Sequence, residues 1–174
     1  MGYWWIHTAP WAQRPGLAAF VLFAGALFSR TTVFWTIERQ GRPIGHCHIR
    51  HIDRSGGHGT AAILIGDKRA QGMGLGVEAL ALRNAYAFQR LGLDRIEVSV
   101  AAKNLASRRL VERSGYRLIG VAKEDAYLDG QKSAVLLFEL LRSDWTGARL
   151  LDERPIGSAI EVAVLGAESP RRLA

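Results

Sequence analysis

Cysteine is nearly absent from this chain of 174 residues, which contains a single one, Cys47. One thiol cannot form an internal disulfide framework, and this usage is typical of proteins of the reducing cytoplasm. The chain also has no internal repeat and no low-complexity tract. These absences exclude a disulfide-stabilised scaffold and a repeat array, and they indicate a cytoplasmic globular protein.

Long apolar runs are also missing, since the apolar run near the N-terminus extends only from Leu17 to Phe28. A helix needs about 20 apolar residues to span a bilayer. As a secretion signal the run has a weak positive flank, with only Arg14 nearby, and one pair of small residues spaced for cleavage, Ala24 and Ala26. We expect a buried helix here, with a targeting segment or membrane contact as the alternative.

Charge and composition indicate one enzyme-sized domain. Hydrophobic residues make up 48% of the chain and charged residues 22%, which are ordinary globular values. The net charge of +7 favours phosphate-rich ligands, acidic acceptors, nucleic acid or an anionic membrane, and a soluble basic surface without a specific partner is the alternative interpretation. Because the basic residues are scattered, without a long run or interleaved aromatic residues, direct nucleic-acid binding is the weaker interpretation.

The most informative segment is Gln71-Gly72-Met73-Gly74-Leu75-Gly76, which separates a strand-like apolar run (61–65) from a helix-like one (77–82). Glycines at alternate positions let an anion approach the backbone, and a helix start supplies unpaired N–H groups and a positive dipole end. The segment therefore predicts a phosphate cradle. No Lys-Ser/Thr pair follows it, and no acidic residue ends the next strand at ribose-binding spacing, so neither a P-loop nor a dinucleotide fold is indicated.

A second segment follows the strand-like run 95–100. It begins at Asn104, continues through Ser107 and Leu110, and ends in Gly115-Tyr116. The two segments resemble the Gln/Arg-x-x-Gly-x-Gly/Ala loop and the Asn-x-x-Ser/Ala-x-x-Leu-x-x-x-x-Gly-Phe/Tyr block of the GNAT acetyltransferases. The resemblance is closest to the branch that acetylates the N-terminal alanine of ribosomal proteins.

The resemblance implies a mixed α/β fold, with a largely antiparallel sheet and flanking helices, known as the GNAT acyl-CoA N-acyltransferase fold. It covers a core at 32–145, preceded by a shortened N-terminal region (1–31) and followed by an extension of unknown role (146–174). Strands 61–65 and 95–101 are expected to splay around the pantetheine arm of acetyl-CoA. The implied acetyl-CoA-binding residues are Gln71, Gly72, Met73, Gly74, Leu75, Gly76, Asn104 and Ser107.

Residue periodicity adds the remaining elements. We expect strands at 33–38, 43–53 and 133–141, one from Tyr116 to about Tyr127, and one at 160–165 in the extension. Residues 3–6 are expected to form a short first strand, and 56–59 a loop before the cradle strand. A helix is expected from Gly74 to Leu91, and Asp129-Gly130 predicts a hairpin turn.

The implied chemistry is attack by an acceptor amine on the acetyl thioester. Many family members carry a tyrosine acid where this chain has Val111, so the resemblance passes the general-acid role to Ser107, with helix capping as its alternative role. Asn104 is expected to bind the coenzyme or to cap the helix.

The general base is less determined. The related branch has a carboxylate where this chain has Ala126, and Glu124 shares the strand parity of that position. Glu97 on the splayed strand is a second candidate, and a water chain is a third. Either carboxylate can also be a solvated surface group.

The histidines of the second strand do not predict a metal site. Alternation places His46 and His48 on one face and Cys47 and His51 on the other, so four ligands do not converge. We expect no metal, although a histidine here can border the acceptor pocket.

The sequence therefore predicts an N-acetyltransferase that moves an acetyl group from acetyl-CoA to a peptide N-terminus, an amino sugar or a small amine. The alternative is a non-catalytic acyl-CoA-binding or nucleic-acid-associated module. Because the shortened N-terminal region is rich in aromatic residues, we also expect a homodimer that covers exposed apolar area.

Overall fold

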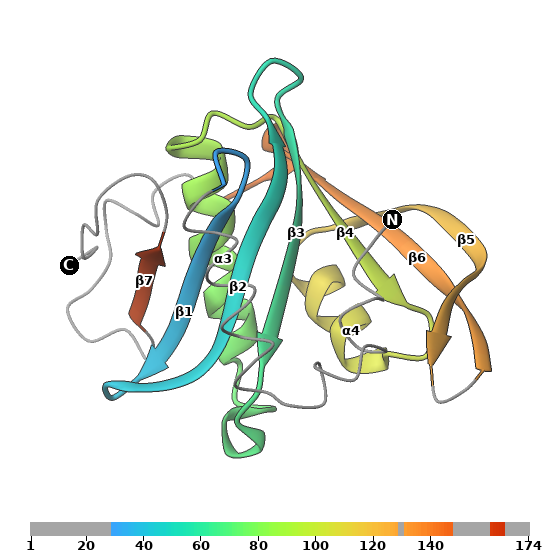
Figure 1. Ribbon diagram of the computed structural model, residues 1–174, viewed down its shortest axis with the longest axis horizontal. Coiled ribbons are helices and arrows are strands. Elements are labelled where there is room, and N and C mark those ends of the chain that lie inside the picture. Colours follow the sequence, from blue (N-terminus) through green and yellow to red (C-terminus); the bar gives the residue numbers. More distant parts are fainter. Residues whose placement is uncertain (1–28, 129–130, 148–160, 166–174) are drawn as a thin grey trace.

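Seven strands form one twisted sheet in the computed structural model, which describes residues 29–128, 131–147 and 161–165, with the backbone alone described at 124–128, 131 and 161–165. The strand order is β5-β6-β4-β3-β2-β1-β7 (Figure 1). The strands are β1 (Val33–Arg39), β2 (Arg42–Asp53), β3 (His58–Ile65), β4 (Arg95–Ala101), β5 (Arg117–Leu128), β6 (Gln131–Leu141) and β7 (Glu161–Leu165).

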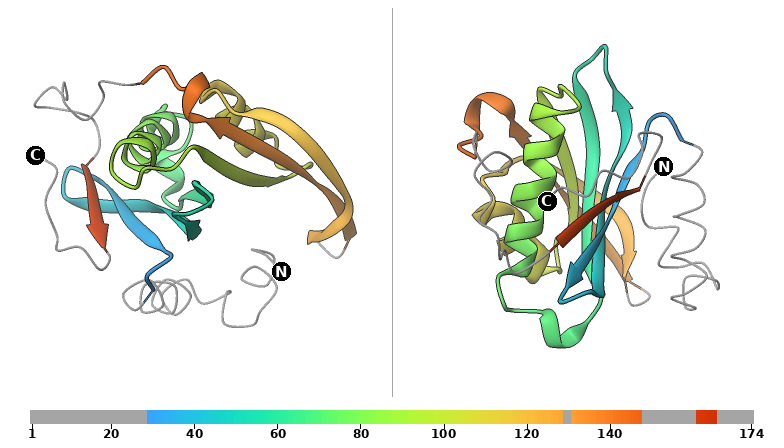
Figure 2. Two further views of the ribbon diagram at one scale, coloured as in Figure 1. Left: turned by 90° about the horizontal axis from the view of Figure 1, so that it is seen from above. Right: turned by 90° about the vertical axis from the view of Figure 1, so that its left-hand side faces the viewer.

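Two α-helices of the described part of the chain, α3 (Leu75–Gln89) and α4 (Leu105–Arg113), lie on the same face of the sheet (Figure 2). Two short 3-10 turns, η2 (Lys68–Ala70) and η3 (Arg142–Asp144), follow β3 and β6. No described helix has both the length and the apolar content needed to cross a membrane.

The sheet consists of two antiparallel halves, β7-β1-β2-β3 and β4-β6-β5. They are joined by the parallel pair β3–β4, whose ladder has only the residue pairs His58–Arg95, Gly59–Ile96 and Thr60–Glu97. Beyond these pairs the two strands diverge, and α4 is visible between them in Figure 1. The mixed α/β class, the largely antiparallel sheet and the splayed neighbouring strands are confirmed.

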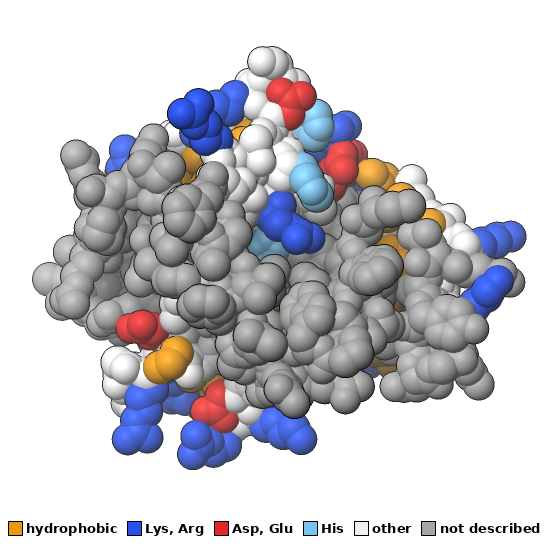
Figure 3. Space-filling view, in the orientation of Figure 1, with side chains coloured by type: hydrophobic (Ala, Val, Ile, Leu, Met, Phe, Trp, Pro, Cys, Tyr) orange, Lys and Arg blue, Asp and Glu red, His pale blue; other side chains and the backbone are white. Residues whose placement is uncertain are grey.

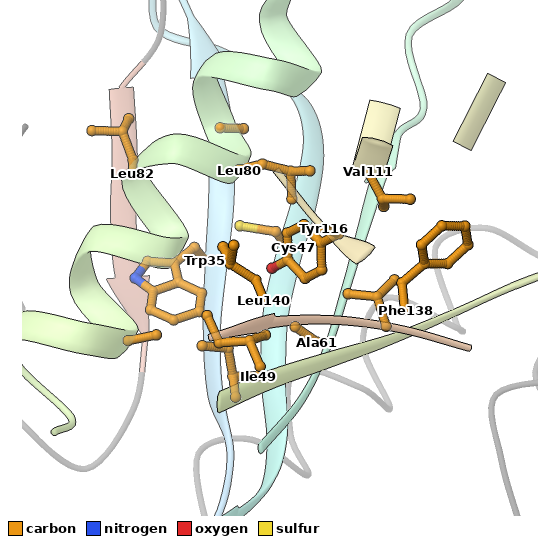
Figure 4. Packing of buried hydrophobic residues seen from close by; sticks show 14 of the residues in the cluster. Trp35, Cys47, Ile49, Ala61, Leu80, Leu82, Val111, Tyr116, Phe138 and Leu140 are labelled. Atoms are coloured by element: carbon orange, nitrogen blue, oxygen red, sulfur yellow. The ribbon is translucent and has the colours of Figure 1, made fainter. Parts of the chain in front are cut away.

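The core fills the space between α3 and the sheet. Trp35 of β1 lies edge-on to Tyr86 of α3, with ring centroids 5.3 Å apart. Leu75, Ala79 and Leu82 of α3 are buried, as the helical spacing predicts. Figure 4 shows these layers meeting around Cys47, Leu80 and Tyr116. Burial of this apolar stripe fixes α3, and therefore the loop before it, against the sheet.

Most predicted elements are present, with small differences at their ends. One boundary is wrong, because β3 starts at His58, inside the predicted loop 56–59. Gly59 looks like a loop residue in sequence, but it pairs with Ile96, and a Cβ there would lie 2.8 Å from Cγ2 of Ile49. Close contact between β2 and β3 therefore requires this glycine within the strand.

The extension contributes β7, which pairs antiparallel with β1, so the strand predicted at 160–165 is present. The predicted segments 3–6 and 17–28 and the turn at 129–130 lie outside the described residues. The boundaries of the core at 32 and 145 remain predictions.

Candidate active site

The loop between η2 and α3 presents a row of unpaired backbone donors. The amide N–H groups of Gly72, Met73, Gly74, Leu75 and Gly76 have no hydrogen-bond acceptor among the described residues. Gly72 and Gly74 have φ angles of +74° and +82°, a region that L side chains rarely adopt. Consecutive amides in such a loop, at the N-terminus of a fifteen-residue helix, form an anion-binding concavity.

Gln71 anchors the loop and does not extend the row of donors. Its backbone N–H donates to the carbonyl of Lys68 at 3.3 Å, and its side-chain Nε2 donates to the carbonyl of Ile65 at 2.9 Å. The backbone amide of Gln71 thus already has an acceptor, and a role of Gln71 in coenzyme binding remains a prediction. The residue instead fastens the start of the loop to the end of β3.

Basic side chains surround this end of the molecule. Nη1 of Arg39, from the end of β1, lies 3.3 Å from Sδ of Met73 in the loop. Lys68 and Arg69 are exposed in the adjacent η2 turn, and Arg69 also pairs with Asp67 at 3.1 Å. Figure 3 shows Lys and Arg side chains at the end of the molecule where this loop lies. Their field adds to the helix dipole in favour of a phosphate-bearing ligand.

Gly76 has a packing role. A Cβ at this position would lie 3.3 Å from both Cδ atoms of Leu110 in α4. The missing side chain therefore lets the first turn of α3 approach α4, which brings the loop close to the second predicted segment.

The divergence of β3 and β4 leaves backbone groups available along both facing edges. Beyond Thr60 on β3 and Glu97 on β4, neither strand has a ladder partner on the side that faces the other. Edge N–H and C=O groups can hydrogen-bond an extended, amide-containing chain. The glycine loop follows β3 after the short η2 turn, and Gln71 ties its start to the end of β3. Such a chain could therefore continue from an anion held at the loop.

Asn104 is the N-cap of α4, because its side chain accepts a hydrogen bond from the backbone N–H of Ser107 at 3.1 Å. Ser107 is the third residue of the helix, so the alternative in which Ser107 caps it is wrong. Its side chain is half-buried, and its hydroxyl has no hydrogen-bond partner among the described residues. The Ser107 hydroxyl is therefore free to donate its proton to a bound ligand.

Two carboxylates, Glu97 and Glu124, are candidates for the general base. Glu97 is half-buried at the point where β3 and β4 separate, and its carboxylate forms an ion pair with Arg95 at 2.8 Å. Glu124 lies in β5, but its side chain is outside the described residues. The β5–β6 register is irregular between Ala122 and Ala126, so simple parity does not relate Glu124 to Ala126.

The histidines of β2 stack instead of converging on a metal. The rings of His46 and His48 lie on one face, with centroids 6.1 Å apart, and both stack on Phe34. Cys47 points into the core on the other face, where burial raises its pKa to about 12. The described residues contain no group of three or more potential metal ligands.

The structure also contains a buried polar group, between α3 and the sheet, that the sequence-based prediction of the site did not include. Arg83 of α3 is 1% exposed, and its Nη2 donates to the Tyr116 hydroxyl at 2.6 Å and to Oδ1 of Asn84 at 3.0 Å. The Tyr116 hydroxyl in turn donates to the same Asn84 oxygen at 2.8 Å. The signal in the sequence is the spacing, since Arg83 follows buried Ala79 by four residues and therefore shares its face.

Comparisons with known proteins agree with this geometry. Residues 3–117 match a family model described as an acetyltransferase (GNAT) domain. The chain is similar to the Probable N-acetyltransferase YjcK of Bacillus subtilis strain 168, with 39% identity over 37% of this chain and 35% of the relative. It is also similar to YdaF of that strain, provisionally named a ribosomal N-acetyltransferase, with 30% identity over 47% of this chain and 45% of the relative.

The matched regions span less than half the length of each of these two relatives. Among solved structures, Mycobacterium smegmatis RimJ in complex with CoA-disulfide superposes with a TM-score of 0.70 and 22% identity, covering 83% of this chain and 72% of that one. At that identity the likeness concerns the fold, and it agrees with the sheet and helices described above.

Proposed function

Because the chain belongs to the GNAT acetyltransferase family, we propose that it is an acetyl-CoA-dependent N-acetyltransferase that acts on a primary amine. One observation carries the proposal. Five backbone amides at the N-terminus of α3 have no acceptor among the described residues, and they follow β3, the strand that diverges from β4, after the η2 turn. A pyrophosphate joined to an extended amide chain matches both features, and the pantetheine arm of acetyl-CoA is such a chain.

In the proposed reaction the acceptor nitrogen forms a bond to the thioester carbonyl carbon, and the bond from that carbon to sulfur breaks. Ser107 donates its hydroxyl proton to the departing sulfur, and the excess proton of the amine passes to a base. We propose Glu97 or Glu124 for this base. The products are an N-acetylated amine and free coenzyme A.

For the acceptor we propose the N-terminal amine of a peptide. The name of YdaF supports this class, since it refers to ribosomal N-acetylation. Amino sugars and small amines are the other acceptors with the required nucleophile.

We further propose that the protein forms a homodimer in the cytoplasm. Single, buried Cys47 agrees with a reducing compartment. Exposed Leu118, Ile119 and Val121 of β5 provide apolar side-chain area that a second copy would cover by side-chain packing, without extending the sheet. Light scattering that shows only monomer at high micromolar concentration would contradict the dimer.

The activity is tested by coenzyme A release from acetyl-CoA with the purified full chain. The acceptors are a peptide with a free N-terminal alanine, the same peptide with its N-terminus blocked, an amino sugar and a polyamine. We expect release with the free peptide and none above background with the blocked one. If coenzyme A were released only with the sugar or the polyamine, the proposed peptide acceptor would be wrong, but the proposed acetyl transfer would still hold.

Calorimetry on the same preparation distinguishes the alternative function. Tight binding of acetyl-CoA without turnover of any acceptor would favour a non-catalytic acyl-CoA-binding module. Absence of binding would refute the role proposed for the glycine loop.

A further inference from the structure

The guanidinium of Arg83 is buried without full hydrogen bonding. Its side chain is 1% exposed, and two of its three nitrogens, Nε and Nη1, are buried without an acceptor. Arginine does not lose its proton in proteins, so this position carries a full positive charge. Removing such a charge from water is costly unless an anion compensates it.

No anion of the described residues does so. The salt bridges of the described part of the chain do not include Arg83, and its hydrogen-bond partners, Asn84 and Tyr116, are uncharged. Its titratable neighbours are neutral at pH 7 as well. Burial raises the pKa of Cys47 to about 12 and also raises the pKa of Tyr116, whereas burial lowers the pKa of His48 to about 3.

The buried charge of Arg83 lies on the helix that begins at the glycine loop. The residue follows the first residue of α3 by eight positions, which is about 12 Å along the helix axis. The charge and the helix dipole therefore act in the same direction on an anion at the loop.

We propose that the phosphates of the coenzyme compensate the Arg83 charge, so that Arg83 strengthens coenzyme binding from inside the core without touching the ligand. This inference rests on the proposed function. It assigns Arg83 a long-range electrostatic role in selecting a phosphate-bearing acyl donor. It also gives a reason for the buried cation, which lowers the stability of the free protein and favours the coenzyme-bound form.

Coulomb's law gives the scale of the effect. With an effective dielectric constant of about 20 and a separation of about 12 Å, one pair of unit charges changes a binding constant by roughly 10-fold. Solvent and salt at the exposed loop screen the interaction. We therefore expect a total effect of about 10-fold on acetyl-CoA, which carries several negative charges.

The test is a series of donors of decreasing charge: acetyl-CoA, acetyl-dephospho-CoA and acetyl-pantetheine. Dissociation constants are measured by calorimetry, or by competition for the weakest ligand, in wild type and Arg83→Met. We expect the loss of affinity to be about 10-fold for acetyl-CoA, smaller for the dephospho form, and under about 2-fold for acetyl-pantetheine. A purely structural role would weaken all three ligands equally and would contradict the proposal.

Two controls separate charge from packing. Tyr116→Phe removes the hydroxyl partner of Arg83 but keeps the charge, so it should leave the ratio between acetyl-CoA and acetyl-pantetheine as in wild type. Cys47→Asp and Cys47→Asn form a matched pair that differs by one charge close to Arg83, and only the aspartate should weaken acetyl-CoA selectively. This pair keeps the proposal testable if Arg83→Met does not fold.

The result that overturns the inference is wild-type affinity for acetyl-CoA in both Arg83→Met and Cys47→Asp. Wild-type protein that fails to bind acetyl-CoA would instead refute the proposed function, so the two failures are distinguishable.

Discussion

Two polar side chains at the start of α4 differ in their hydrogen bonding. Asn104 accepts the hydrogen bond that caps the helix, and the hydroxyl of Ser107 is not used for capping. A serine that capped the helix would contribute to stability, whereas a serine with an unused proton can serve chemistry. The two roles can therefore be tested on different residues.

Ser107→Ala should slow acetyl transfer by roughly 10²-fold, because the departing sulfur would lose its proton donor. Its melting temperature should stay close to that of wild type, since the cap is intact. Asn104→Ala is the matched variant for stability, with an expected loss of about 1 kcal/mol, or roughly 2 to 4 °C. Turnover and melting are measured on the same samples. Unchanged turnover per folded molecule in Ser107→Ala would remove the acid role.

His48 should make the protein sensitive to acid. Burial lowers its pKa to about 3 in the folded protein, from an ordinary value of 6.5. Between these values the unfolded chain binds a proton that the folded chain does not, so stability falls as pH decreases from 6.5 toward 3. At pH 5 the expected loss relative to pH 7.5 is about 2 kcal/mol.

Urea unfolding at pH 7.5 and pH 5.0 measures this loss. His48→Phe keeps a ring that can stack on Phe34 and removes the titrating group. Between pH 7.5 and pH 5.0, the free energy of unfolding of this variant should therefore fall by about 2 kcal/mol less than that of wild type. An equal decrease in both proteins would show that another group causes the acid sensitivity.

At the scale of elements, the glycines at the two ends of α3 share one backbone conformation and equally open surroundings, but only one of them belongs to the glycine loop. Gly74 begins α3 with a φ of +82°, and Gly92 follows the end of the same helix with a φ of +72°. A Cβ at either position would have no atom within 4 Å. Substitution at both sites therefore has the same backbone cost, about 1 to 2 kcal/mol, without a steric clash.

Gly74→Val should weaken acetyl-CoA binding by about 10- to 100-fold, which corresponds to the loss of a charge-assisted hydrogen bond in a reshaped loop. Gly92→Val should lose a similar amount of stability and keep wild-type affinity. Calorimetry on both folded variants makes the comparison. Equal affinity in the two variants would show that the loop amides do not hold the coenzyme.

The elements predicted from sequence are those whose signals are local. Alternation in β1 and β2, the apolar stripe of α3 and the cap-forming Asn104 all lie within short segments. The start of β3 was missed because Gly59 belongs to the strand only through its contact with Ile49. Helical spacing places Arg83 on the buried face of α3, but its contact with Tyr116 could not be predicted, since the two residues are 33 positions apart in the chain. Contacts between distant segments are not encoded in local pattern.

At the scale of the whole molecule, β7 and β5 form the two edges of the sheet. β1 is covered by β7, which pairs with five of its residues, Phe34 through Glu38. β5 forms the opposite edge, interrupted by irregular register near Leu118 and near Ala122. Irregular pairing discourages edge-to-edge association, whereas a regular uncovered edge promotes it.

Deletion of residues 146–174 removes β7 and exposes the β1 edge. We expect a loss of about 2 kcal/mol, or roughly 4 to 8 °C, together with increased aggregation. Deletion of 166–174 alone keeps β7 and is the matched control. Turnover per folded molecule should stay the same in both proteins, because β7 pairs with β1 and neither the glycine loop nor α4 is part of that pairing. A longer deletion that leaves melting unchanged would show that β7 contributes nothing to stability.

The β1–β7 pair also determines how the molecule responds to mechanical load. Phe34 near the start of β1 lies opposite Leu165 at the end of β7. Tension applied through the two ends of the chain therefore acts on the same end of this ladder and opens it one residue pair at a time, the geometry that resists force least. If domains fused to both ends pulled on the chain, β7 would separate from β1 before the force reached β3 and β4. The β1–β7 ladder therefore protects the β3–β4 pair from mechanical load.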